Sequence, residues 1–298
     1  MFSGQGSQYA NMGLDVLSKD KDKVLLANEI LGFDVIAALK NENEELSNTK
    51  YTQPLMVLVS ILLFDSFREK NDYDFLLGFS LGEYSALYAA GIYSFSDILK
   101  IVKYRSEIME EAASKNPGKM AAVINFDYEI LNGIVNDINN NEDKIVTIAN
   151  YNSKKQLVIS GNNLGVDLTI EKLKELGARR VIPLNVSGGF HSILMKDASN
   201  LLYDYLKGFN KNPNQKPLYL NTTANALVFD DLEKELKRQM YQSVKFYQTI
   251  ENLINEGVLR FIEIGPGKVL KNLVQKNYDN LEVLNIENIN DLKSLEDK

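Results

Sequence analysis

The sequence of 298 residues contains no cysteine, a single histidine and no excess of basic residues. Without cysteine there is no disulfide framework, no thiolate nucleophile and no thiolate metal site, and one histidine excludes a metal site built from several histidines. Lys and Arg number 33 against 40 Asp and Glu, which gives a formal net charge of −7 and not the basic surface of a nucleic-acid binder. We therefore expect no metal, no other cofactor and no nucleic-acid partner.

The sequence also has no long apolar run and no targeting segment. Its longest apolar stretch, residues 55–64, covers about half of the roughly 20 residues that a membrane-spanning helix needs. A buried helix is the better interpretation of this stretch. The N-terminal residues MFSGQGSQ have neither the basic nor the apolar region of a secretory signal. The prediction is a cytoplasmic, monomeric protein with no membrane partner.

The remaining composition is that of a folded enzyme, with 45% apolar and 24% charged residues. At about 150 residues per domain, the length predicts two domains or subdomains. Strands alternate with helices before residue 116 and again after residue 187, which predicts a mostly parallel sheet covered by helices. The expected strands are at 74–77, 216–221, 259–264 and 281–286. One helix is expected to start at 52–54, with Pro54 just inside it, and a second is expected to end at Gly91. Two more helices are expected at 96–114 and 269–275.

Residues 119–186 follow a different pattern of strand, helix, strand, strand, helix and strand, which is the order of a ferredoxin-like unit. The expected strands are at 119–126, 144–149, 156–160 and 179–186, and the expected helices are at 128–139 and 164–176. Because this unit lies inside the chain, we expect it to form an inserted small subdomain at 118–187. Residues 1–117 and 188–298 then form a large α/β subdomain.

Residues 78–82 fit the pattern G-x-S-x-G between an apolar strand and a helix. The glycines permit a sharp turn that lifts the Ser80 hydroxyl out of the sheet, and the N–H of Leu81 then points to where an oxyanion would form. A serine hydroxyl needs a base near neutral pH, and His191 is the only histidine. His191 follows two glycines in a loop after a strand, at the sheet edge where ligands of open α/β sheets bind. The sequence therefore predicts a Ser80–His191 pair.

Two further features are ambiguous on the residues alone. Residues 4–8 form a glycine-bounded loop, GQGSQ, which is either the source of a second oxyanion donor or an ordinary turn. Arg105 lies on the apolar face of the helix expected at 96–114. It either extends its charged end to solvent or is buried and binds a carboxylate through both arms of its guanidinium.

Six blocks of the sequence resemble the malonyl-CoA:acyl carrier protein transacylases. They are GQGSQ at residues 4–8, GFSLGEYSA at 78–86, YRS at 104–106, ANYNS at 149–153 with VISG at 158–161, GFHS at 189–192 with LM at 194–195, and EIGPGKVL at 263–270. The blocks follow the order of that family and together span almost the whole chain. The resemblance implies a hydrolase-like α/β core with a mostly parallel sheet, into which a ferredoxin-like α+β subdomain is inserted.

The resemblance also implies an activity and the roles of individual residues. The activity is transfer of a malonyl group from malonyl-CoA to acyl carrier protein through an ester on the enzyme, which supplies fatty-acid elongation. The implied roles are Ser80 as the acylated nucleophile, His191 as its general base, the backbone N–H groups of Gln5 and Leu81 as the oxyanion hole, the backbone carbonyl of Gln239 as the group that orients the histidine, Arg105 as the receptor of the malonyl carboxylate, and Phe190 and Asn152 as substrate-binding residues.

The sequence departs from this family before the nucleophile and at its N-terminus. Phe79 and Ser3 stand where the family usually has His and Pro. Since residue 79 is not the base, catalysis should survive this difference. The family has a buried strand before the first glycine loop, whereas this sequence begins with Met1 and Phe2. We therefore expect exposed neighbouring strands and a loosened Gln5.

Three other functions stay open on the sequence. A serine esterase or thioesterase shares the serine turn, but such enzymes usually place the histidine near the C-terminus after an aspartate. Here more than a hundred residues follow His191, and a carboxylate-binding arginine has no evident use in such an enzyme. A trans-acting polyketide acyltransferase uses the same residues. A non-catalytic binding protein is compatible with the absent first strand.

Overall fold

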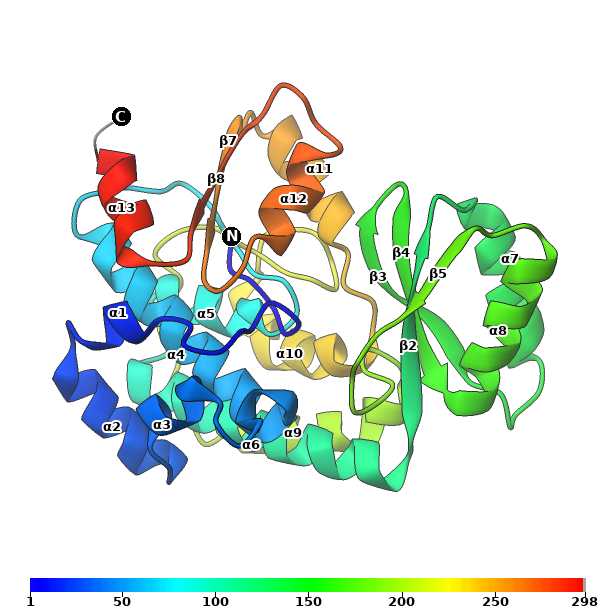
Figure 1. Ribbon diagram of the computed structural model, residues 1–298, viewed down its shortest axis with the longest axis horizontal. Coiled ribbons are helices and arrows are strands. Elements are labelled where there is room, and N and C mark those ends of the chain that lie inside the picture. The colour runs from blue at the N-terminus through cyan, green and yellow to red at the C-terminus, as the bar shows by residue number, and fades with distance from the viewer. Residues whose placement is uncertain (297–298) are drawn as a thin grey trace.

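A computed structural model describes residues 1–296 of the chain (Figure 1). Helices and short parallel strands make up one side of the molecule, and a four-stranded antiparallel sheet with two helices makes up the other. The helices of the first side are α1 (Leu14–Leu17), α2 (Lys21–Leu31), α3 (Val35–Lys40), α4 (Thr49–Arg68), α5 (Gly82–Ala89), α6 (Phe95–Lys115), α9 (Lys196–Leu206), α10 (Leu232–Tyr241), α11 (Phe246–Asn255), α12 (Val269–Gln275) and α13 (Ile289–Glu296).

The parallel strands form two pairs that the N-terminus connects. Strand β1 (Leu76–Leu77) pairs with β6 (Leu218–Tyr219), and β7 (Arg260–Ile264) pairs with β8 (Glu282–Ile286). Phe2 forms parallel bridges to both Gly78 and Ile264. The strands thus lie in one layer and all run parallel, which confirms the mostly parallel sheet predicted for this part of the chain.

Met1 and Phe2 lie between the two strand pairs directly before the first glycine loop, whereas the loosening of Gln5 stays a prediction. The Phe2 N–H donates to the Leu77 carbonyl at 3.0 Å, and the Phe79 N–H donates to the Phe2 carbonyl at 3.0 Å. On the other side, the Ile264 N–H donates to the Met1 carbonyl at 2.8 Å. These bonds anchor the chain on both sides directly before the first glycine loop.

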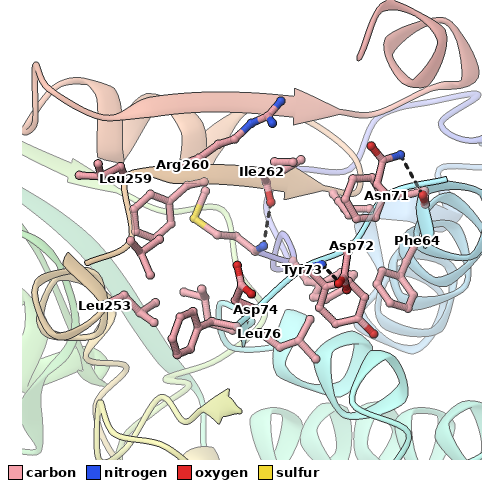
Figure 2. Close-up of a pocket in the computed structure, with 18 of the residues that line it drawn as sticks. Phe64, Asn71, Asp72, Tyr73, Asp74, Leu76, Leu253, Leu259, Arg260 and Ile262 are labelled. Atoms are coloured by element: carbon pink, nitrogen blue, oxygen red, sulfur yellow. Dashed lines mark hydrogen bonds between the residues drawn. The ribbon is translucent and has the colours of Figure 1, made fainter. Parts of the chain in front are cut away.

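Beyond Met1 the layer opens into a cavity of about 750 Å³ between β1 and β7 (Figure 2). Apolar side chains line much of it, among them Phe64, Leu76 and Leu253. The Met1 amino group donates to the Ile262 carbonyl at 2.7 Å, and burial lowers the pKa of this amino group to about 5 although the nearby Glu263 opposes the shift. Leu76, Leu77 and Phe261 are nevertheless buried, so the expected exposure of the neighbouring strands is wrong except at Leu259 and Arg260, where β7 begins.

The antiparallel sheet has the strand order β3-β4-β2-β5 and carries its two helices on one face (Figure 1). Its elements are β2 (Gly118–Ile124), α7 (Tyr128–Asn139), β3 (Val146–Ser153), β4 (Gln156–Asn162), α8 (Asn163–Glu175) and β5 (Arg180–Pro183). This order confirms the ferredoxin-like pattern. Strand β3 ends four residues later than predicted and so carries Asn152, whereas β5 ends earlier, and Leu184 leaves the sheet to line a pocket.

Helix α4 contains the apolar stretch and is buried along most of its length, as predicted. Its predicted start at 52–54 is wrong, because the Asn48 side chain accepts from the Lys50 N–H at 2.8 Å and caps the helix earlier. Pro54 lies inside the helix and has no N–H for the Lys50 carbonyl, which accepts instead from the Ser106 hydroxyl at 3.5 Å. None of the helices within residues 1–296 combines the length and the apolar character that crossing a membrane requires.

Candidate active site

The turn between β1 and α5 places Ser80 at the start of the helix in an uncommon backbone conformation, with φ at 50°. Both flanking glycines are required by close backbone contacts. A Cβ on Gly78 would lie 2.0 Å from the Gly82 carbonyl carbon, and a Cβ on Gly82 would lie 2.2 Å from the Phe2 oxygen. The sharp strand-to-helix turn predicted from the G-x-S-x-G pattern is therefore confirmed.

Ser80 and His191 are directly hydrogen-bonded, with 2.7 Å between Ser80 Oγ and His191 Nε2. On the other side of the ring, Nδ1 lies 2.7 Å from the Gln239 backbone oxygen. Because a carbonyl only accepts, Nδ1 carries the hydrogen and Nε2 is left to accept from the serine hydroxyl. The His191 N–H also donates to the Met240 carbonyl at 3.1 Å. The last carbonyls of α10, which have no partners inside the helix, thus fix the histidine.

The histidine is buried, and burial lowers its pKa to about 4, with the cationic Arg105 adding to the shift and the Gln239 carbonyl opposing it. The imidazole is therefore neutral near pH 7 and able to accept a proton. A serine hydroxyl bonded to a neutral, oriented imidazole is the arrangement that activates serine as a nucleophile.

The loop at residues 4–8 packs against the serine turn. A Cβ on Gly4 would lie 2.4 Å from the Phe79 oxygen, so only glycine permits this contact. Within residues 1–296, the N–H groups of Gln5 and Leu81 donate no hydrogen bond to another protein group. Both residues line the pocket that contains Ser80. The loop is therefore part of the site, and two unused N–H donors are available for an oxyanion.

This pocket has a volume of about 450 Å³ and collects most of the residues predicted from the sequence. Those that line it are Gln5, Ser80, Leu81, Arg105, Asn152, Phe190 and His191. Gln239 is fully buried and contacts three of these residues without lining the pocket. Residues predicted from distant parts of the sequence therefore lie together in the folded chain.

Arg105 is 1% exposed, which excludes the alternative in which its charged end reaches solvent. Nη1 donates to the Gln53 side-chain oxygen at 2.6 Å, and Nη2 donates to the Gln239 side-chain oxygen at 3.3 Å. Its Nε has no hydrogen-bond partner within residues 1–296, and the guanidinium lies 5.1 Å from the centre of the Tyr84 ring. No carboxylate within residues 1–296 forms an ion pair with it. A buried cation whose two hydrogen-bond partners are neutral amides favours an anion in the adjoining pocket.

Asn221 and Glu83 support the serine turn, and the sequence reasoning missed both. The Asn221 side chain accepts from the Ser80 N–H at 2.6 Å and donates to the Gly78 carbonyl at 2.6 Å. The Asn221 backbone N–H donates to the Glu83 carboxyl group at 2.7 Å. Burial raises the pKa of this carboxyl group to about 8, although the bond from the Asn221 N–H opposes the shift. Glu83 directly follows the G-x-S-x-G pattern, and this position could have identified it from the sequence. Nothing local marks Asn221, 141 residues away from Ser80.

Residues 1–295 match the family of acyl transferase domains. The chain belongs to this family. The malonyl CoA-acyl carrier protein transacylase of Bacillus subtilis is 40% identical over 282 residues, which are 93% of this chain and 89% of that protein. The enzyme of the same name from Staphylococcus aureus is 36% identical over 298 residues, which are 98% of this chain and 96% of that protein.

Solved structures of the family share the whole fold. The structure of MCAT from Streptococcus pneumoniae has a TM-score of 0.93 at 38% identity and covers 99% of this chain, with 97% of that chain matched. A malonyl-transacylase solved in complex with a type II PKS acyl-carrier protein has a TM-score of 0.94 at 31% identity and covers 100% of this chain, with 98% of that chain matched. These acyl transferases confirm the α/β fold class and the resemblance drawn from the six sequence blocks.

Proposed function

We propose that this acyl transferase moves a malonyl group from malonyl-CoA to the phosphopantetheine thiol of acyl carrier protein and so supplies fatty-acid elongation in the cytoplasm. One observation carries the proposal: the Ser80–His191 pair shares its pocket with Arg105, a buried cation that has no carboxylate partner in the described chain. Malonyl-CoA brings a free carboxylate to the reacting end of the molecule. The names of the relatives support the same reaction.

In the first half-reaction, Ser80 Oγ attacks the thioester carbonyl while His191 Nε2 takes the hydroxyl proton. The negative charge that forms on the carbonyl oxygen is held by the N–H groups of Gln5 and Leu81. The carbon–sulfur bond then breaks, the coenzyme A thiolate leaves with the proton from His191, and a malonyl ester stays on Ser80.

In the second half-reaction the carrier-protein thiol is the attacking group and the Ser80 oxygen is the leaving group. The carrier-protein thiol gives its proton to His191 Nε2 and attacks the ester carbonyl, and the same two N–H groups hold the oxyanion. The carbon–oxygen bond to Ser80 breaks, and the serine oxygen regains a proton from His191. The product is malonyl-carrier protein, and the Ser80–His191 pair returns to its starting state.

Three side chains of the pocket bind the substrate in this proposal. Arg105 receives the malonyl carboxylate. Asn152 lines the pocket with a buried side-chain oxygen that has no hydrogen-bond partner in the described part of the chain, and this oxygen is free to accept from an amide N–H of the pantetheine arm. Phe190 is buried beside His191, and its ring leaves little room for a methyl group on the acyl chain.

We also propose the division into subdomains expected from the sequence, with a small subdomain at 118–187 and a large one at 1–117 and 188–298. The four strands of the antiparallel sheet all lie within the smaller segment. The pocket draws on both segments, because Met120 and Val158 of the sheet line it together with Ser80. Substrate then binds where the two segments meet.

Arg105→Ala is expected to reduce malonyl transfer by roughly 2–5 kcal/mol, the range for truncating one partner of a buried charge pair. Acetyl transfer should be unchanged or faster, because acetyl-CoA brings no carboxylate to the site. Arg105→Lys keeps the charge but loses the planar fork, so it should fall between the wild type and the alanine variant. The measurement is kcat/KM for both thioesters with each protein. A malonyl-to-acetyl ratio within about threefold of the wild type, well short of the tenfold that about 1.4 kcal/mol represents, contradicts the role of Arg105.

Incubation with radiolabelled malonyl-CoA tests the proposed function as a whole. We expect a stable malonyl-protein that passes its label to acyl carrier protein when the carrier is added. Release of free malonate in place of transfer indicates a serine hydrolase. A protein that takes up no label indicates a binding protein without acyl-transfer activity.

A further inference from the structure

The side chain of Gln239 connects two parts of the site that are otherwise separate. Its Nε2 donates to the Ser80 backbone oxygen at 2.7 Å, and its Oε1 accepts from Arg105 Nη2 at 3.3 Å. The residue is 0% exposed, so its own amide group is shielded from solvent. The amide thus joins the carboxylate-binding arginine to the serine turn.

The Ser80 oxygen belongs to the same peptide group as the Leu81 N–H. This group is planar and trans, so the N–H points away from the carbonyl. A bond that fixes the direction of the Ser80 oxygen therefore fixes the direction of the Leu81 N–H. The Glu83 N–H also donates to the Ser80 oxygen, at 3.1 Å along the turn, but Gln239 is the only side chain within residues 1–296 that does so.

The backbone conformation of Ser80 explains why its carbonyl group needs this contact. A non-glycine residue at positive φ is held only where its surroundings determine the conformation, and Ser80 has a φ of 50°. The Asn221 side chain holds its N–H at 2.6 Å, and Gln239 holds its carbonyl. In addition, the charge on Arg105 polarises the Gln239 amide, and hydrogen bonds in a chain strengthen one another.

We propose that the side chain of Gln239 is a positioning residue: it holds the Ser80–Leu81 peptide so that the Leu81 N–H faces the oxyanion, and it couples this peptide to Arg105. The inference rests on the proposed function, because it concerns how the same oxyanion hole is oriented. It is separate from the backbone role of Gln239 toward His191, since that contact uses the main-chain oxygen. A side-chain substitution therefore tests one role and leaves the other in place.

Gln53 is the matched control, because it holds Arg105 without touching the serine turn. Its Oε1 accepts from Arg105 Nη1 at 2.6 Å. Its Nε2 faces the side-chain oxygen of Gln5 at 3.3 Å and the Met109 sulfur at 3.5 Å. Loss of the Gln53 amide should thus affect the carboxylate receptor more than the oxyanion hole.

The experiment compares Gln239→Met with Gln53→Met, since methionine keeps the unbranched shape and has no amide. The rate of Ser80 acylation is measured with malonyl-CoA and with acetyl-CoA as a function of pH. For Gln239→Met we expect kcat to fall about tenfold or more with both thioesters, part of the roughly 10²–10³-fold that a whole oxyanion donor supplies. KM for acetyl-CoA and the apparent pKa of the reaction should not change. Gln53→Met should reduce the malonyl rate more than the acetyl rate.

Two results overturn the inference. One is an acetyl rate of Gln239→Met within about threefold of the wild type, which is less than the tenfold that about 1.4 kcal/mol represents. The other is a lower rate together with a shifted pH profile, because a displaced α10 moves the carbonyl that binds His191. If Gln239→Met does not fold, Gln239→Glu replaces it, since glutamate keeps the size and the acceptor for Arg105 but has no donor for the Ser80 oxygen. A wild-type rate in that variant overturns the inference equally.

The same assay separates this inference from the proposed function. A wild-type protein that forms no malonyl ester contradicts the proposed function. A wild-type protein that forms the ester, beside a Gln239→Met variant that forms it equally fast, contradicts only the role of the Gln239 side chain.

Discussion

Ser80→Ala is expected to abolish the malonyl ester completely. Wild-type protein mixed with malonyl-CoA should gain the mass of one malonyl group per chain, and the alanine variant should gain none, because no other group in the pocket combines a hydroxyl with a bond to His191 Nε2. Intact-mass spectrometry measures this directly. Alanine removes only the hydroxyl, so the fold should persist.

Ser85→Ala is the matched control for this variant. Ser85 lies in α5 beyond the turn, and its buried hydroxyl has no hydrogen-bond partner among residues 1–296. The Ser85→Ala protein should gain one malonyl group, as the wild type does. Persistent labelling of Ser80→Ala shows that a different residue is acylated and removes Ser80 from the mechanism.

His191→Ala is expected to slow acylation by roughly 10²–10⁴-fold, the usual range for loss of a general base. The variant keeps the Ser80 hydroxyl and the two N–H donors, so a slow reaction should remain. The pH dependence of the wild type gives a second check. Because the neutral imidazole is the active form and burial lowers the His191 pKa to about 4, the acylation rate should stay level from neutral pH down to roughly pH 5 and fall as pH approaches that pKa.

A second variant separates loss of the base from backbone strain. His191 has a φ of 58°, which asparagine tolerates better than alanine. His191→Asn should therefore fold at least as well and react as slowly. Rapid acylation in either variant, within a few-fold of the wild type, means that another group takes the proton. A rate that falls with a midpoint near pH 6.5 means that the histidine is not desolvated as the structure shows.

Local patterns in the sequence predicted the elements whose signals are local. The bounds of α7 and α12 agree with the prediction, because helical spacing and the flanking turns define both. The start of α4 was misplaced because Pro54 is typical of a first helical turn, whereas the Asn48 cap decides the start. The end of β3 was missed because its polar residues 150–153 resemble a loop. Two of them, Asn150 and Asn152, line the pocket that contains Ser80.

The candidate site shows the same division between local and distant signals. Ser80 lies in a pattern whose geometry points directly to a nucleophile, and His191 is the only histidine in the sequence. Whether Arg105 is buried or extends to solvent cannot be read from helical spacing, and only the packed structure decides it. Gln53 and Asn221 act through bonds that span 52 and 141 residues. No periodicity relates such positions, so their parts in the site emerge only from the three-dimensional structure.

Because the chain has a single histidine, the ring of that residue can report on the reaction by NMR spectroscopy. His191 is the one histidine among 298 residues, and both of its ring nitrogens have defined partners, Ser80 Oγ and the Gln239 oxygen. Labelling histidine with ¹⁵N therefore yields a single pair of ring signals. Esterification of Ser80 removes the proton that Nε2 accepts, while the bond at Nδ1 stays. One nitrogen resonance should move and the other should stay, so that each turnover is visible without a reporter group or a coupled enzyme.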